Sequence, residues 1–187
     1  MKLRIISLSL TLVLAPSMLL SEIKSQAAIQ KVVAASNACH IEAYVVDPDP
    51  KGLNVRYGPG TEYGIITRLL SQNDTTVAIK GANGSWVLID EAFELDAVEK
   101  TEGLNGKGWV YAPMLALTTR YVGLAKEPAV RLFKEPNKNS AVLIRLMRET
   151  EVKVVGCRGS WVQVQYKNYT GWLDAESQCG NPVTTCS

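Results

Sequence analysis

The chain has 187 residues, with 20 basic and 18 acidic side chains, a net charge of +2 at pH 7, and one histidine. Residues 1–27 hold three of the basic groups and one of the acidic groups, so the remainder carries 17 of each. A neutral chain lacks the basic excess on which nucleic-acid binding depends, and we expect no nucleic-acid partner. A single histidine offers little for the usual zinc sites or for general-base catalysis, so no catalytic residue, metal or cofactor is expected.

Residues 1–27 have the pattern of a cleavable signal peptide. Lys2 and Arg4 give a charged start, and the apolar stretch of residues 5–20 is interrupted by Pro16. Small residues then precede a cleavage site that we place after Ala27. The apolar stretch is shorter than the roughly 20 residues that span a bilayer, which argues against the alternative, an uncleaved membrane anchor. We therefore expect a periplasmic or extracellular protein without a membrane span in its mature chain.

Cysteine usage agrees with an oxidising compartment. All four cysteines lie after the expected leader, at Cys39, Cys157, Cys179 and Cys186. An even number of cysteines without a Cys-x-x-Cys pair favours two disulfides over metal binding. Three pairings are possible, and the positions favour one bridge between the start of the chain and its end region.

Short apolar runs rich in β-branched and aromatic residues, separated by glycine, proline and asparagine, predict antiparallel strands and an all-β fold. Asn83-Gly84 and Arg158-Gly159 are placed for tight hairpins with positive φ angles. The expected strands are Ile41–Val46, Leu53–Val55, Ile65–Leu70, Val77–Ile79, Trp86–Ile89 and Trp109–Tyr111, then Tyr121–Leu124, Val130–Phe133, Val142–Met147, Val152–Val155, Trp161–Val164 and Trp172–Leu173.

Three landmarks occur twice in the same order. A Gly-Ser-Trp hairpin contains Trp86 and again Trp161, 75 positions apart (161 − 86), and a Val-Arg pair repeats at the same spacing, with Arg56 and then Arg131. A Gly-Trp strand, with Trp109 or Trp172, closes each copy. The duplication predicts one small module used twice, and the recurrence of arginine suggests that it braces each barrel.

The two copies differ in length and charge. The first carries an acidic insertion at residues 90–106, which we interpret as a solvated extension with a possible helical turn at residues 92–98; its carboxylates lack the spacing of a calcium loop. Residues 28–118 hold 7 basic and 11 acidic groups, and residues 119–187 hold 10 and 6, so the halves carry −4 and +4. The expected organisation is a signal peptide (1–27), a linker (28–39), a first barrel (40–118), a second barrel (119–178) and a cysteine-containing tail (179–187).

The loop at residues 55–64, Val-Arg-Tyr-Gly-Pro-Gly-Thr-Glu-Tyr-Gly, together with the Gly-Ser-Trp hairpin and the Gly-Trp strand, resembles the bacterial Src-homology-3 (SH3b) family. The resemblance is strong over residues 43–117. It is weaker over residues 121–177, a degenerate copy that has lost the loop glycines. It implies two tandem five- to six-stranded barrels, and a non-catalytic exported module that binds peptidoglycan peptides or targets partners to the wall.

Aromatic side chains give such a barrel its binding surface, because they offer rigid contact area with little loss of entropy. The expected groove of the first barrel uses Tyr57, Tyr63, Trp86, Trp109 and Tyr111, with Glu62 or Asp90 for an amine, and its second-copy equivalents are Trp161 and Trp172. The alternatives are an accessory module that docks onto an envelope enzyme and a self-associating protein. A nucleophile next to a suitably placed base is not evident, so an enzyme is not expected.

Overall fold

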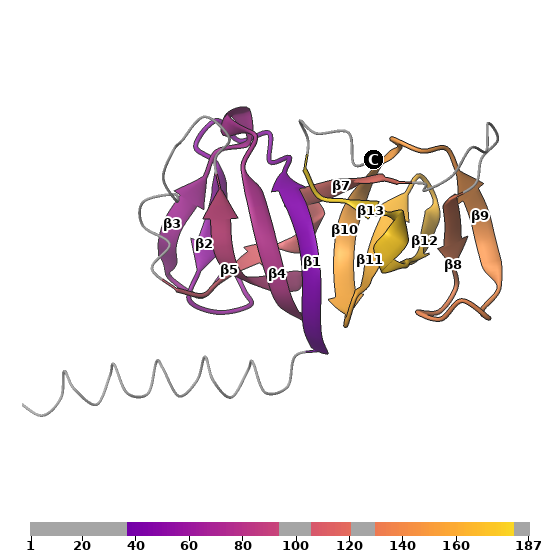
Figure 1. Cartoon of the computed structure of the whole chain (residues 1–187). Coiled ribbons are helices and arrows are strands. Elements are labelled where there is room, and N and C mark those ends of the chain that lie inside the picture. Colours follow the sequence, from indigo (N-terminus) through magenta and orange to yellow (C-terminus); the bar gives the residue numbers. More distant parts are fainter. Residues whose placement is uncertain (1–36, 94–105, 121–129, 182–187) are drawn as a thin grey trace, which may run out of the picture.

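The computed structural model describes residues 37–93, 106–120 and 130–181, which form an all-β fold, as predicted (Figure 1). The expected leader, residues 94–105 of the expected acidic insertion (90–106), the expected strand at 121–124 and the end of the tail, with Cys186, lie outside the described residues. Residues 90–93 of that insertion continue strand β5, so the helical turn expected from residue 92 is wrong at its start. The strands are β1 (Asn37–Val45), β2 (Leu53–Arg56), β3 (Ile65–Leu69), β4 (Thr76–Asn83), β5 (Trp86–Phe93), β6 (Gly108–Tyr111), β7 (Leu115–Thr119), β8 (Val130–Phe133), β9 (Val142–Leu146), β10 (Glu151–Arg158), β11 (Trp161–Tyr166), β12 (Tyr169–Leu173) and β13 (Gln178–Cys179). Three short 3-10 helices accompany them, at Ser71–Asn73, Ala112–Met114 and Ala175–Ser177.

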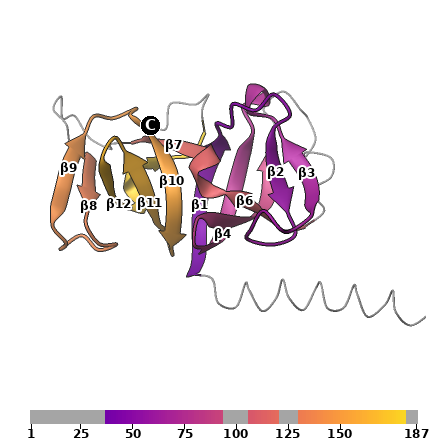
Figure 2. The ribbon, with the colours of Figure 1, turned by 180° about the vertical axis from the view of Figure 1, so that it is seen from behind.

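The strands form two units that lie side by side in both views of the ribbon (Figures 1 and 2). The strand order β3-β2-β6-β5-β4-β1-β7-β10-β11-β12-β8-β9 runs through the first unit and then the second. Gly84 and Gly159 occupy the predicted hairpin turns with φ of +57° and +58°, a conformation that glycine adopts without strain. Within the described ranges, no helix has the length and hydrophobicity needed to cross a bilayer.

Strand β7, which the sequence patterns did not predict, joins the two units. On one edge, β7 pairs with β1 through Leu115 and Ala116 and then with β13. On its other edge, β7 pairs with β10 from Ala116 to Thr118. Leu115, Ala116 and Leu117 are all fully buried. The buried hydroxyl of Thr119 donates to the Met147 carbonyl at 2.6 Å and accepts from the Thr150 amide at 3.0 Å, so this polar group is satisfied.

Covalent and polar contacts cross the same junction. Cys39 on β1 forms a disulfide with Cys157 on β10, 118 positions later, which confirms the expected bridge between the start of the chain and its second half. The Gly159 amide donates to the Ala38 carbonyl at 2.7 Å, and the Tyr44 hydroxyl donates to Glu151 Oε2 at 3.0 Å. Cys179 is also disulfide-bonded, and its partner lies outside the described residues.

Alternating side chains build a core that continues through both units. Val87, Ile89 and Val110 of the first unit and Val162 and Val164 of the second are fully buried members of one hydrophobic cluster.

The glycine before each closing tryptophan allows two strands to approach closely. A Cβ on Gly108 would overlap Val55, and a Cβ on Gly171 would overlap Leu132, which explains the repeated Gly-Trp pair.

The strand pairing corrects the alignment of the two copies. Leu53 lies opposite Leu69 and Arg56 opposite Ile65, whereas Val130 lies opposite Leu146 and Phe133 opposite Val142. The structural offset is therefore 77 (130 − 53) in this hairpin, not the 75 that the repeated Val-Arg pair suggested. The alignment predicted from the repeated Val-Arg pair was therefore wrong. The pair recurs by chance, whereas the pairing of the strands is fixed by which of their residues are buried.

The counterpart of Arg56 is thus Phe133, and the counterpart of Arg131 is Asn54. Two further pairings support this register, since Arg56 lies opposite Trp109 and Phe133 lies opposite Trp172. The two barrels therefore carry different chemical groups at equivalent places.

We predict that the Cys39–Cys157 bridge is a main source of stability. Replacing both cysteines by alanine is expected to lower the free energy of unfolding by about 2–4 kcal/mol, because the unfolded chain is no longer constrained. Urea unfolding of the double variant measures the change. Mass spectrometry of unreduced peptides should first show Cys39 linked to Cys157, and a Cys39–Cys179 peptide would contradict the structure.

The contact between Tyr44 and Glu151 predicts a pH-dependent stability. Burial first, and then the hydrogen bond and charge of Glu151, raise the pKa of Tyr44 well above its ordinary value near 10. The stabilisation is therefore complete below pH 10 and is lost as pH rises beyond 10, where the unfolded chain releases the tyrosine proton first. Tyr44→Phe should lower the unfolding free energy by about 1–2 kcal/mol at neutral pH.

The difference in unfolding free energy between wild type and Tyr44→Phe is expected to narrow between pH 10 and 11. Chemical denaturation at several pH values measures this difference directly, and other ionising groups cancel because both proteins carry them. A difference that is independent of pH would show that Tyr44 titrates normally.

Candidate functional site

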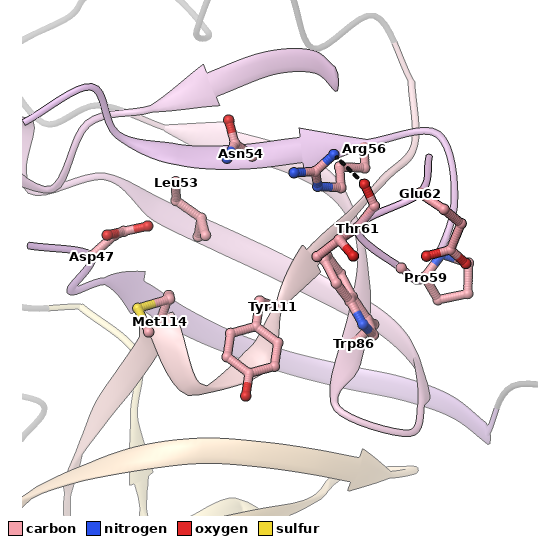
Figure 3. Close-up of a pocket in the computed structure, with 11 residues that line it drawn as sticks. Asp47, Leu53, Asn54, Arg56, Pro59, Thr61, Glu62, Trp86, Tyr111 and Met114 are labelled. Atoms are coloured by element: carbon pink, nitrogen blue, oxygen red, sulfur yellow. Dashed lines mark hydrogen bonds between the residues drawn. The ribbon is translucent and has the colours of Figure 1, made fainter. Parts of the chain in front are cut away.

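The first unit contains a groove of about 730 Å³, a volume in the range of small-ligand pockets (Figure 3). It lies between the glycine-rich loop of residues 57–64, the start of β5 and the end of β6. Its lining is Asp47, Leu53, Asn54, Arg56, Pro59, Gly60, Thr61, Glu62, Trp86, Tyr111 and Met114.

Trp86 and Tyr111 form the aromatic part of the groove. They are direct cross-strand partners on β5 and β6, with ring centroids 5.7 Å apart and ring planes inclined by 58°. Tyr111 is 39% exposed and Trp86 is half-buried. Such a tilted pair leaves ring faces and edges available to a ligand, while the strand pairing keeps the rings in place.

Arg56 holds the glycine-rich loop over the barrel. Its guanidinium donates to the Thr61 carbonyl at 3.2 Å and to the Tyr63 carbonyl at 2.6 Å. The Tyr57 amide donates to the Gly64 carbonyl at 3.1 Å and closes the loop at its base. Both bonds come from Nη1, so Arg56 positions the loop while it also lines the groove.

Close approach explains why this loop contains glycine. A Cβ on Gly58 would overlap the Tyr63 ring, and a Cβ on Gly60 would overlap the Glu62 carboxylate. Neither glycine has a positive φ, so the requirement comes from packing. The two glycines therefore let Tyr63 and Glu62 lie flat across the backbone, and the Glu62 carboxylate stays at the groove.

The structure separates the aromatic residues that we expected to form one surface. Trp86 and Tyr111 line the groove, as does Glu62, whereas Tyr57 and Tyr63 are exposed, at 49% and 36%, on parts of the loop that do not line it. Trp109 is fully buried, so the expectation that its ring contacts a ligand there needs correction. Trp109 and Tyr111 are two positions apart on β6 and therefore share one face of the strand, but the Trp109 ring is covered.

Two carboxylates lie at opposite ends of the groove, with Tyr111 between them (Figure 3). Glu62 lies beside Pro59 and Trp86 at one end, and Asp47 lies near Met114 and Leu53 at the other. Asp90, the other residue considered for an amine, is elsewhere, 3.6 Å from Lys80. Sequence analysis did not assign Asp47, Leu53, Asn54 or Met114 to the groove. Leu53, Asn54 and Met114 lie beside repeated landmarks, but the landmarks do not show which side chains face the loop.

The second unit keeps the same loop backbone with different side chains. The bonds Lys134 N–H to the Ala141 carbonyl and Ser140 N–H to the Asn137 carbonyl repeat those of the first loop at the offset of 77. The loop therefore keeps its form without glycine. Ser140 stands where Tyr63 does, and Asn139 where Glu62 does, so no ring or carboxylate has to lie against the backbone at residues 135 and 137.

An ion-pair cluster takes the place of the groove in the second unit. Lys138, the counterpart of Thr61, lies 3.0 Å from Glu176 and 3.6 Å from Asp174, which corresponds to Tyr111. The hydrogen bond to Glu176, followed by the nearby charge of Asp174, raises the pKa of Lys138. Trp161 and Trp172, the expected equivalents of the groove tryptophans, are both half-buried there.

Comparison with known proteins identifies the repeated unit. Residues 51–116 and 128–177 match the family model of the bacterial SH3 domain. Among curated proteins, the chain is 24% identical over 133 residues to a putative N-acetylmuramoyl-L-alanine amidase, YrvJ, of Bacillus subtilis (strain 168). The match covers 66% of this chain and 23% of that protein, so the chain spans less than a quarter of its relative's length.

Among solved structures, two chains from Trichomonas vaginalis are similar to this one. NlpC2 is 13% identical, with a TM-score of 0.29, and the match covers 74% of this chain and 47% of that one. NlpC1 is 10% identical, with a TM-score of 0.28, and the match covers 74% and 45%.

The packing of Gly58 against Tyr63 can be tested by exchange between the two copies. Gly58→Ala alone is expected to destabilise the first unit by about 1 kcal/mol or more, because the added methyl group displaces the ring. Adding Tyr63→Ser, which introduces the residue that the second loop has at this place, should restore most of the lost unfolding free energy. Urea unfolding of both single variants and the double variant measures the coupling, and strictly additive losses would contradict this explanation.

Proposed function

Because the chain belongs to the bacterial SH3 domain family, we propose that it is an exported, non-catalytic protein whose first barrel binds peptidoglycan peptides. The observation that supports this proposal best is the groove itself, with an aromatic pair between two carboxylates. The similarity to a putative amidase of peptidoglycan supports a role at the cell wall. The expected leader and its cleavage remain part of the proposal.

The chemistry of the groove suits an extended peptide with a free amino group. Trp86, Tyr111 and Leu53 provide apolar contact, and Asn54 provides an amide next to them. Glu62 can accept hydrogen bonds from an ammonium group, which is a charge-assisted interaction. Peptides of the wall carry such amino groups as well as carboxylates, and Arg56 also lines the groove.

The lining residues favour binding over bond cleavage. Among the described residues of the groove there is no histidine, cysteine or serine, and its two carboxylates lie at opposite ends. A hydrolase of the acid–base type needs a nucleophile or a water held between groups at short range. His40, the one histidine of the chain, is on β1 and does not line the groove.

Retention on purified peptidoglycan sacculi tests the proposal. Wild type should be retained well above an albumin control, and Tyr111→Ala should weaken binding by about tenfold or more, since an aromatic group at a binding surface typically contributes that much. Glu62→Gln should weaken it less, and more at low salt than at high salt. Urea unfolding should show that both variants remain folded.

Tyr57→Ala is the matched control, because Tyr57 is an exposed aromatic residue outside the groove. It should leave retention unchanged. Equal losses for Tyr57→Ala and Tyr111→Ala would place the binding surface elsewhere, and no retention of wild type would refute the proposed function.

A further inference from the structure

One face of the second barrel carries arginine side chains on aromatic rings. The Arg131 guanidinium lies over the Phe133 ring, 5.0 Å from its centroid, and the Arg158 guanidinium lies 5.9 Å from the centroid of the Trp172 ring. Phe133 and Trp172 are cross-strand partners on β8 and β12, so the two rings that carry these arginines stand on neighbouring strands.

A third arginine extends this series. Arg145 on β9 lies directly opposite Arg131 on β8, and both side chains are exposed. Two like charges at opposed positions of an antiparallel pair repel each other and are unfavourable when nothing neutralises them. We call the surface made by Arg131, Arg145 and Arg158 with their two rings the arginine face.

The described residues offer this face no neutralising carboxylate. Asp174, two residues after Trp172, and Glu176 are both paired with Lys138. No ion pair joins an acid of the described ranges to Arg131, Arg145 or Arg158. Three of the ten basic residues of the second half therefore lie on this face without an ion pair to any acid of the described ranges.

We infer that the arginine face is a binding site for an anionic polymer with closely spaced carboxylate or phosphate groups. A guanidinium stacked on a ring has its rotamers restricted while its N–H edge remains free, and this edge matches both groups in bidentate fashion. Arg131 and Arg145 would share neighbouring anionic groups, which removes their mutual repulsion. The second barrel is then a site of opposite chemistry and not a lost copy of the first.

The counterparts in the first barrel make the contrast specific. Asn54 stands in place of Arg131, Arg56 in place of Phe133, and Asn83 in place of Arg158. Arg68 corresponds to Arg145, but its Nε donates to Asn54 at 2.9 Å. The first barrel therefore has two arginines at these places, and both donate hydrogen bonds within the barrel.

Binding of the full chain to two labelled polymers tests the inference. The probes are N-acetylated polyglutamate and polyglycerol phosphate, which lack free amino groups, so binding does not depend on the groove or on the proposed peptide ligand. Wild type should bind at least one of them, more weakly as salt is raised. Arg131→Gln with Arg145→Gln should weaken binding by about tenfold or more.

Arg68→Gln is the matched control and should leave the affinity unchanged, since it removes the equivalent charge from the first barrel. Arg131→Lys keeps the charge but loses the planar stack, and should restore binding only in part. Binding of one probe alone assigns the face to carboxylates or to phosphates. The inference fails if neither probe binds, or if a DNA oligonucleotide binds more tightly than both polymers. It also fails if Arg68→Gln weakens binding as much as the double variant does, or if Arg131→Lys binds as tightly as wild type.

Discussion

The structure depends on the hydrogen bonding of β7, which has partners from both units along its two edges. A strand in this position turns two barrels into one sheet, and the Cys39–Cys157 bridge and the Tyr44–Glu151 hydrogen bond cross the same junction. Each of these contacts alone would restrict the relative motion of the two units only weakly, but together they restrict it strongly. The groove and the arginine face are thus held in a fixed relation, which lowers the protein's share of the ordering cost for a polymer that contacts both.

The loop of residues 57–64 shows how a binding surface and a packing constraint are coupled. Gly58 and Gly60 are needed because Tyr63 and Glu62 lie across them, and Glu62 is the carboxylate at the groove. In the second barrel, the equivalents of Tyr63 and Glu62 are short polar residues, and the glycines are gone while the backbone hydrogen bonds remain. Glycine in this loop therefore accompanies a particular surface chemistry and is not needed for the fold itself.

Much of the fold could be predicted from the sequence, because buried alternating residues and glycine turns are local signals. Strand β7 was missed because only three residues, Ala112–Met114, separate it from β6, and its strand partners are distant in the chain. The groove was predicted only in part. Trp109 alternates toward the outside like Tyr111, yet it is buried, and whether an outward residue is covered depends on segments that periodicity cannot place.

The duplicated Val-Arg pair gave the wrong register, and this error concealed the most informative difference between the barrels. At an offset of 75, Arg56 and Arg131 look like one conserved brace, and the second copy looks like a weaker version of the first. At the offset of 77 that strand pairing requires, Arg56 corresponds to a phenylalanine and Arg131 to an asparagine. Fixing the backbone register thereby shows that equivalent positions of the two barrels carry different chemical groups. If both proposals hold, two copies of one barrel, held together by β7, would bind groups of opposite charge on one protein.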